Sequence, residues 1–172
     1  MTILRLDDLF NTYGDEKYAE LAVFLDLLRG LQLLHQTAHW QTKGNTFYAD
    51  HLLFQRLYEA VAEEIDGLGE KAVGLGSERL VDYNHSLTNM NLFLNAVDDL
   101  ISTETISPAD LLANKALKAE LAFVRAGEKL MNLLKDKGLL TRGIENLLGG
   151  ILDNHESSIY LLKQRVKAWY IR

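Results

Sequence analysis

A stripe of mostly apolar side chains in the middle of this chain constrains its fold more than any other feature. Nine positions between residues 47 and 75 follow one another in steps of four and three, the spacing that keeps them on one face of an α-helix. They are Phe47, His51, Phe54, Tyr58, Val61, Ile65, Leu68, Ala72 and Leu75. The stripe predicts one long helix with an inward face, and one member of that face is a histidine.

Three more helices are predicted from the same kind of periodicity. We expect the four long helices to cover residues 15–42, 46–75, 107–137 and 141–169. The buried candidates of the first helix include Tyr18, Leu21, Leu25, Leu28 and Leu34. Ser107 is the predicted N-cap of the third helix, with Pro108 at its first position, and Thr141 is the predicted N-cap of the fourth. Trp169 is the last predicted apolar position of the fourth helix.

The connection between the second and third helices is long. Residues 77–107 would be unusual as a structureless loop, so they predict a crossover that carries a short helix. Four long helices with one such connection predict an all-α four-helix bundle with a crossover. Because no repeat or linker divides the chain, we expect a single domain over residues 1–172, with a short extension over residues 1–14.

The composition agrees with this class. The 172 residues are 48% apolar and 24% charged, which is typical of one globular domain. Twelve glycines and a single proline favour helices over a turn-rich β fold. The chain has no cysteine, which excludes disulfides and thiolate metal sites. It shows no membrane-spanning apolar run and no signal-peptide pattern, so the cytoplasm is the expected location.

Two histidines and a row of acids carry the candidate chemistry. The acids form a second row beside the apolar stripe, on a neighbouring face of the same helix, and such a row is most often a solvated face. They are Glu59, Glu63, Asp66 and Glu70. Imidazole and carboxylate groups together suit iron or zinc. His51 and Asp66 are fifteen positions apart, roughly 22 Å along one helix, so one ion cannot touch both within one chain. Two antiparallel copies across a two-fold axis would bring the two ends together and create two sites per dimer.

These residues resemble the signature of the Dps family, the miniferritins of the ferritin-like superfamily. The matching positions are His39-Trp40, Gly44, Phe47, His51, Asp66 and Glu70, in order, spacing and residue type. The fourth helix is similar more weakly, at His155-Glu156 and Tyr160-Leu161-Leu162.

The resemblance implies a ferroxidase centre between subunits of a hollow homododecamer. The implied catalytic residues and iron ligands are His39 and His51 of one chain with Asp66 and Glu70 of another. The implied activity is the oxidation of Fe(II) to Fe(III), with hydrogen peroxide as the preferred oxidant or else dioxygen, followed by storage of Fe(III) in the shell. The chain has no Glu-x-x-His motif, which a di-iron centre inside one bundle would use.

Two positions depart from the family pattern. Gln55 stands where the family commonly has Asp, and an uncharged amide oxygen is a poorer ligand for a second iron. Asn146 stands where the family often has an Asp that lines the iron-entry pore, and either Glu145 or Asp153 could replace that charge.

Three alternatives stay open. His35 and His39 are four positions apart on one helical face and could bind zinc adventitiously. A DNA-condensing shell is the second alternative, although the net charge of −6 would repel a phosphate backbone unless basic groups cluster locally. Residues 163–172 carry four basic side chains and no acid. The third alternative is a structural helical oligomer without iron activity.

Overall fold

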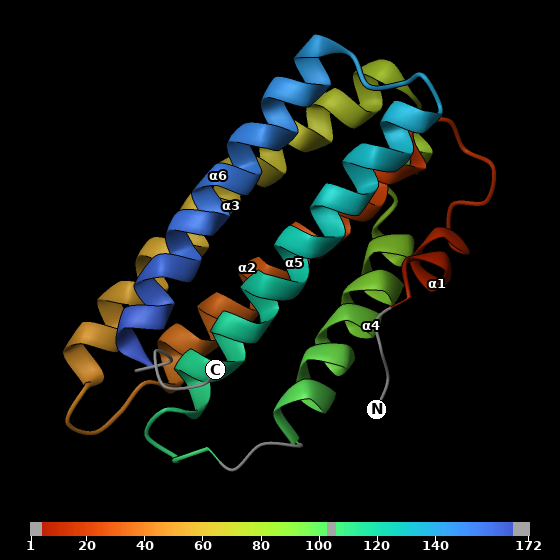
Figure 1. Cartoon of the computed structure of the whole chain (residues 1–172). Coiled ribbons are helices and arrows are strands. Elements are labelled where there is room, and N and C mark those ends of the chain that lie inside the picture. Colours follow the sequence, from red (N-terminus) through yellow and green to blue (C-terminus); the bar gives the residue numbers. More distant parts are fainter. Residues whose placement is uncertain (1–4, 103–105, 167–172) are drawn as a thin grey trace.

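The computed structural model of the protein describes residues 5–102 and 106–166. Within these ranges the chain forms six α-helices, one 3₁₀-helix and no β-strand (Figure 1). The elements are α1 (Leu6–Phe10), α2 (Ala19–Gln41), α3 (Phe47–Leu75), the 3₁₀-helix η1 (Glu78–Val81), α4 (Tyr83–Ser102), α5 (Leu111–Asp136) and α6 (Arg142–Arg165). The predicted all-α class is confirmed.

Four long helices form the predicted bundle. α2 packs along α3 and α5, and α5 packs along α6 (Figure 1). α3 and α6 approach each other at few positions. α4 belongs to the crossover between α3 and α5 and lies against α2 and α5. It is 20 residues long rather than short, because Phe93, Ala96 and Val97 give it a buried face against the bundle.

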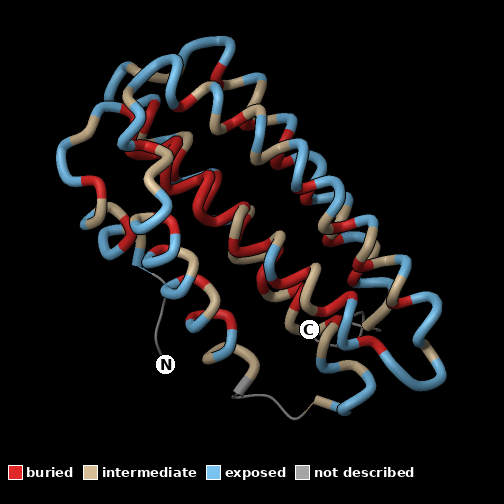
Figure 2. Tube along the Cα trace, turned by 180° about the vertical axis from the view of Figure 1, so that it is seen from behind, coloured by how far each residue is buried: buried red, intermediate tan, exposed pale blue. Residues whose placement is uncertain are grey.

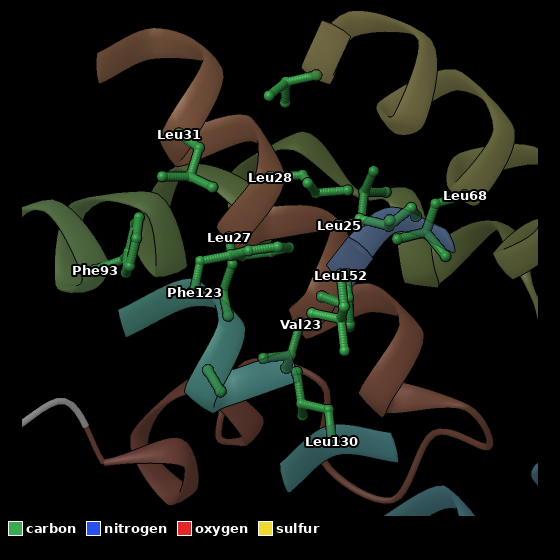
Figure 3. Close-up of a cluster of buried hydrophobic side chains, with 14 of the residues drawn as sticks. Val23, Leu25, Leu27, Leu28, Leu31, Leu68, Phe93, Phe123, Leu130 and Leu152 are labelled. Atoms are coloured by element: carbon green, nitrogen blue, oxygen red, sulfur yellow. The ribbon is translucent and has the colours of Figure 1, made fainter. Parts of the chain in front are cut away.

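α2 is the central helix of the molecule. Every residue from Ala19 to Leu28 is buried, because α3, α4 and α5 all pack against this helix (Figure 2). The predicted core positions Tyr18, Leu21, Leu25, Leu28 and Leu34 are all buried. Figure 3 shows the centre of the core, where α2 supplies Leu25 and Leu28, α3 supplies Leu68, α5 supplies Phe123 and α6 supplies Leu152. A bundle packed in this way holds the faces of α2 and α3 in fixed positions.

The starts of two helices differ from the prediction. α2 begins at Ala19 instead of Asp15, because Tyr18 has a left-handed φ of 67° and a helix cannot run through it. Ser107 does not cap α5. The backbone oxygen of Ser107 accepts the backbone N–H of Asp110 at 2.9 Å in a turn that also contains Pro108, and the helix begins only after this turn.

The start of α6 agrees with the prediction. Thr141 is its N-cap, and the side-chain oxygen accepts the backbone N–H of Ile144 at 3.2 Å. Trp169 lies outside the described residues. None of the helices within the described ranges combines the length and the hydropathy that a bilayer crossing requires.

The apolar stripe of α3 is buried only in its middle. Phe54, Val61 and Leu68 are buried, but Phe47 is 44% exposed and Leu75 is 38% exposed. The prediction that the whole stripe faces inward is therefore wrong at both ends. The reason is that α2 alone among the long helices packs extensively against α3, so the ends of α3 extend past the core.

Candidate functional site

His39 and His51 lie face to face where α2 turns into α3. Their ring centroids are 3.7 Å apart and the ring planes are inclined by 24°. Two hydrogen bonds join the residues: His39 Nδ1 is 2.9 Å from the backbone oxygen of His51, and His51 Nδ1 is 3.1 Å from the backbone oxygen of His39. The turn between the helices contains Gly44 at a φ of 80°, a left-handed conformation that favours glycine.

This reciprocal contact fixes how both rings can bind a metal. A carbonyl oxygen only accepts hydrogen bonds, so each Nδ1 carries the hydrogen and donates it. In the neutral imidazole the lone pair is then on Nε2, and metal-bound histidines commonly donate their other N–H to a backbone carbonyl in this way. The rings are also held by aromatic neighbours, since Phe47 stacks on His51 and Tyr58 meets His39 edge-on. The two Nε2 atoms are therefore positioned before any metal arrives.

Asp66 and Glu70 lie one turn apart on the exposed face of α3. Both line a surface hollow of about 520 Å³, together with Arg29 of α2 and Val81 of η1. The acids that precede them in the row are exposed as well, which agrees with a solvated face. Gln55 does not meet the histidines through its nitrogen, which donates to Glu59 Oε1 at 2.8 Å.

A single chain does not bring the four predicted ligands together. His51 and Asp66 both lie on α3, and the fifteen residues between their positions correspond to roughly 22 Å of helix. Among the residues that the structure describes, no group of three His, Asp or Glu side chains is arranged to hold a metal ion. A metal site built from these four ligands needs a second copy of the chain.

Sequence reasoning missed a buried ion network that joins the four long helices. His35 Nε2 of α2 lies 2.7 Å from Glu120 Oε1 of α5, and the other Glu120 oxygen lies 2.5 Å from His155 Nδ1 of α6. His155 Nε2 then lies 2.9 Å from Glu64 Oε2 of α3. Each nitrogen of His155 meets a different carboxylate, so the groups form a chain and do not surround one point. The signal in the sequence was Glu120, an acid inside the apolar pattern of the third helix.

Burial and charge act against each other in this network. Burial alone would raise the pKa of Glu120, but the charge of His155 and hydrogen bonds from both histidines lower it to about 2. Burial would likewise lower the pKa of His155, but the charge of Glu120 and hydrogen bonds to Glu120 and Glu64 raise it to about 9. The core therefore holds a carboxylate and an imidazolium at neutral pH. His35 is engaged by Glu120 in this chain, which disfavours the alternative zinc pair of His35 with His39.

Comparison with known proteins identifies two relatives. Over 130 residues, or 76% of the chain, it is 29% identical to the nutrient stress-induced DNA-binding protein of Synechococcus sp. (strain ATCC 27144 / PCC 6301 / SAUG 1402/1), and the match covers 69% of that protein. Over 97 residues, or 56% of the chain, it is 28% identical to the protein of the same name from Nostoc sp. (strain PCC 7120 / SAG 25.82 / UTEX 2576). The chain spans about half the length of this second relative, at 52%. No family model matches the chain.

The helical order and the long crossover define an all-α protein of the ferritin-like bundle class. Both relatives carry a name that is used for members of the Dps family. The predicted resemblance to that family is therefore confirmed.

Proposed function

We propose that this protein oxidises Fe(II) at sites shared between two subunits and stores the resulting Fe(III) inside a hollow homododecamer. Each site would take His39 and His51 from one chain, with Asp66 and Glu70 of the partner subunit. The observation that carries the proposal is the reciprocal pair of hydrogen bonds that leaves both histidine Nε2 atoms available to a metal. The dodecameric assembly is what the resemblance to the Dps family implies.

Iron is the substrate in this reaction. Carboxylate ligands stabilise Fe(III) more than Fe(II), so coordination by Asp66 and Glu70 lowers the reduction potential and favours loss of an electron. The neutral imidazoles of His39 and His51 complete the ligand set and leave room for the oxidant. Two Fe(II) ions supply the two electrons that convert one hydrogen peroxide and two protons into two waters. Dioxygen is the alternative oxidant.

Exposed apolar side chains support the pairing of two chains. Trp40, Tyr48 and Leu52 lie beside the two histidines and are 69%, 73% and 45% exposed. At the other end of α3, Val73 and Leu75 lie just beyond Glu70 and are also exposed. An antiparallel arrangement of two α3 helices would cover the apolar side chains at both ends while it brings the histidines to the acids.

Stopped-flow measurement of Fe(III) formation after mixing the apo-protein with Fe(II) and hydrogen peroxide tests the proposal. We expect fast, saturable oxidation by the natural protein and oxidation at the rate of buffer alone by the Asp66→Ala/Glu70→Ala variant, with the assembly preserved. Glu63→Ala removes a neighbouring acid of the same row and is the matched control, which should keep the natural rate. Unchanged kinetics in the double variant would reject the site. If the natural protein does not accelerate oxidation, a structural oligomer is the better account.

DNA binding is the second candidate function, because both relatives are named as DNA-binding proteins. The net charge of −6 per chain opposes it. One of the basic side chains near the chain end is also not free, because Arg165 donates to Asp50 and Asp110 at 2.6 and 2.7 Å. A gel-shift assay at low and moderate salt decides the question. We expect no retarded DNA at moderate salt, and a stable retarded complex there would establish DNA binding.

A further inference from the structure

Arg29 of α2 lies in the same surface hollow as Asp66 and Glu70. A guanidinium group that met either carboxylate would form a charge-assisted pair and occupy an oxygen that the proposed iron site requires. The ion pairs of the described residues do not join Arg29 to either acid. Arg29 Nη1 donates instead to the hydroxyl oxygen of Ser86 on α4. The arginine is thus held beside the acids but is not paired with them.

The group that holds Arg29 is itself fixed in the core. Ser86 is 2% exposed, and its hydroxyl donates to Asp26 Oδ1 at 2.5 Å. Because that bond uses the only hydroxyl hydrogen, the serine oxygen is left as an acceptor for Arg29. The other oxygen of Asp26 accepts from Tyr13 at 2.6 Å and from Asn89 at 2.8 Å. Asp26 is fully buried, so this anchor is part of the packing among α2, α4 and the segment after α1.

We propose that Ser86 positions Arg29 so that the iron-binding acids stay unpaired, and that Arg29 sets the affinity of the site for Fe(II). The inference rests on the proposed function. Arg29 does not bind iron; it acts on the metal through its charge, which lowers the attraction of the acids for a cation. When the serine hydroxyl is absent, the guanidinium group is free to turn toward Asp66 and Glu70 and compete with iron directly.

Two variants and their combination test this arrangement in the assembled protein. Anaerobic titration measures the affinity for Fe(II), and stopped-flow oxidation measures the rate at saturating Fe(II). Arg29→Gln is expected to bind Fe(II) about threefold more tightly, and Ser86→Ala about threefold more weakly, since exposed charge pairs are of this strength. The double variant should bind like Arg29→Gln alone, because no guanidinium group remains to be released. Ser158→Ala removes an exposed hydroxyl of α6 and is the control.

The combination separates positioning from structural damage. If Ser86→Ala weakens Fe(II) binding equally with and without Arg29, its effect does not pass through the arginine and the inference is wrong. If Arg29→Gln leaves the affinity unchanged while Asp66→Ala/Glu70→Ala abolishes binding, the inference fails and the proposed function stands. If the natural protein binds no Fe(II), both fail together. Should Ser86→Ala not assemble, Arg29→Gln alone decides, and its gain in affinity should shrink as salt rises.

Discussion

His155 of α6 joins three helices through buried ion pairs with Glu120 of α5 and Glu64 of α3. Its two ring nitrogens meet Glu120 and Glu64 at 2.5 and 2.9 Å, and the side chain is 2% exposed. Removing one partner of a buried ion pair leaves the other charge without compensation, which costs about 3–5 kcal/mol. We therefore expect His155→Ala to lower the free energy of unfolding by about 3 kcal/mol, measured by urea denaturation at one fixed protein concentration. The exposed neighbour Glu156→Ala should cost little, and an equal loss in both variants would contradict the prediction.

The same pair makes this stability depend on pH. The pKa of His155 is raised from 6.5 to about 9, so its contribution is complete below pH 6.5 and is lost as the pH rises toward 9. The pKa of Glu120 is lowered from 4.5 to about 2, so its contribution is complete above pH 4.5 and is lost as the pH falls toward 2. The difference in unfolding free energy between the natural protein and His155→Ala should therefore shrink between pH 6.5 and 9. A difference that stays constant over this range in urea denaturation would show that the charge of His155 does not matter.

The sequence was sufficient to predict one pair of polar groups, His39 with His51, but not the other, Glu120 with His155. His39 and His51 could be predicted as a pair because a short turn separates them and because their spacing matches a known family pattern. Glu120 and His155 could not, because their contact depends on how α5 and α6 settle against each other, and periodicity does not specify that register. The role of Asp66 stays a prediction, because its expected partners belong to another chain.

The interhelical spacing of the bundle is set at a few close approaches, and Gly127 of α5 is one of them. A Cβ atom added there would lie 2.7 Å from Leu152 Cδ2 and 3.0 Å from Phe24 Cε2, so the Leu152 side chain on α6 and the buried Phe24 ring on α2 would have to move. Gly127→Ala is expected to destabilise the protein by about 1–2 kcal/mol despite the better helix propensity of alanine. Gly150→Ala on α6 has no neighbour within 4 Å of the added atom and should stabilise by about 0.5–1 kcal/mol. Thermal unfolding of the two variants should therefore shift in opposite directions, and shifts of the same sign would contradict this account.

Whole helices were predictable because each buries one face, and burial leaves a periodic pattern in the sequence. Their starts were less predictable. α2 begins after Tyr18 because the backbone of Tyr18 is left-handed, and the residue type tyrosine does not predict this conformation. The exposed ends of the α3 stripe, Phe47 and Leu75, have the same periodicity as its buried middle. An apolar pattern marks a face that becomes covered, but it does not say whether the same chain or another copy covers it.

Iron oxidation and subunit assembly should depend on the same surface of the protein. The exposed Trp40 stands next to His39, and in the proposed antiparallel pair it would pack against the partner near the acid end of α3. Trp40→Glu places a charge in that contact and should convert the assembly to smaller species, as measured by sedimentation velocity. Oxidation of Fe(II) should fall to the rate of buffer alone, although all four predicted ligands are still present in every chain.

Tyr160→Glu provides the control for this experiment, because Tyr160 is a similarly exposed aromatic residue on α6 and lies outside the proposed contact. It should keep both the assembly and the oxidation rate. A Trp40→Glu protein that is monomeric but still oxidises Fe(II) rapidly would show that one chain holds the complete site, which the separation of His51 and Asp66 along α3 argues against. If Trp40→Glu assembles normally, the surface around Trp40 is not part of the subunit contact. The proposed antiparallel pairing of two α3 helices, which brings the histidines to the acids, would then be wrong.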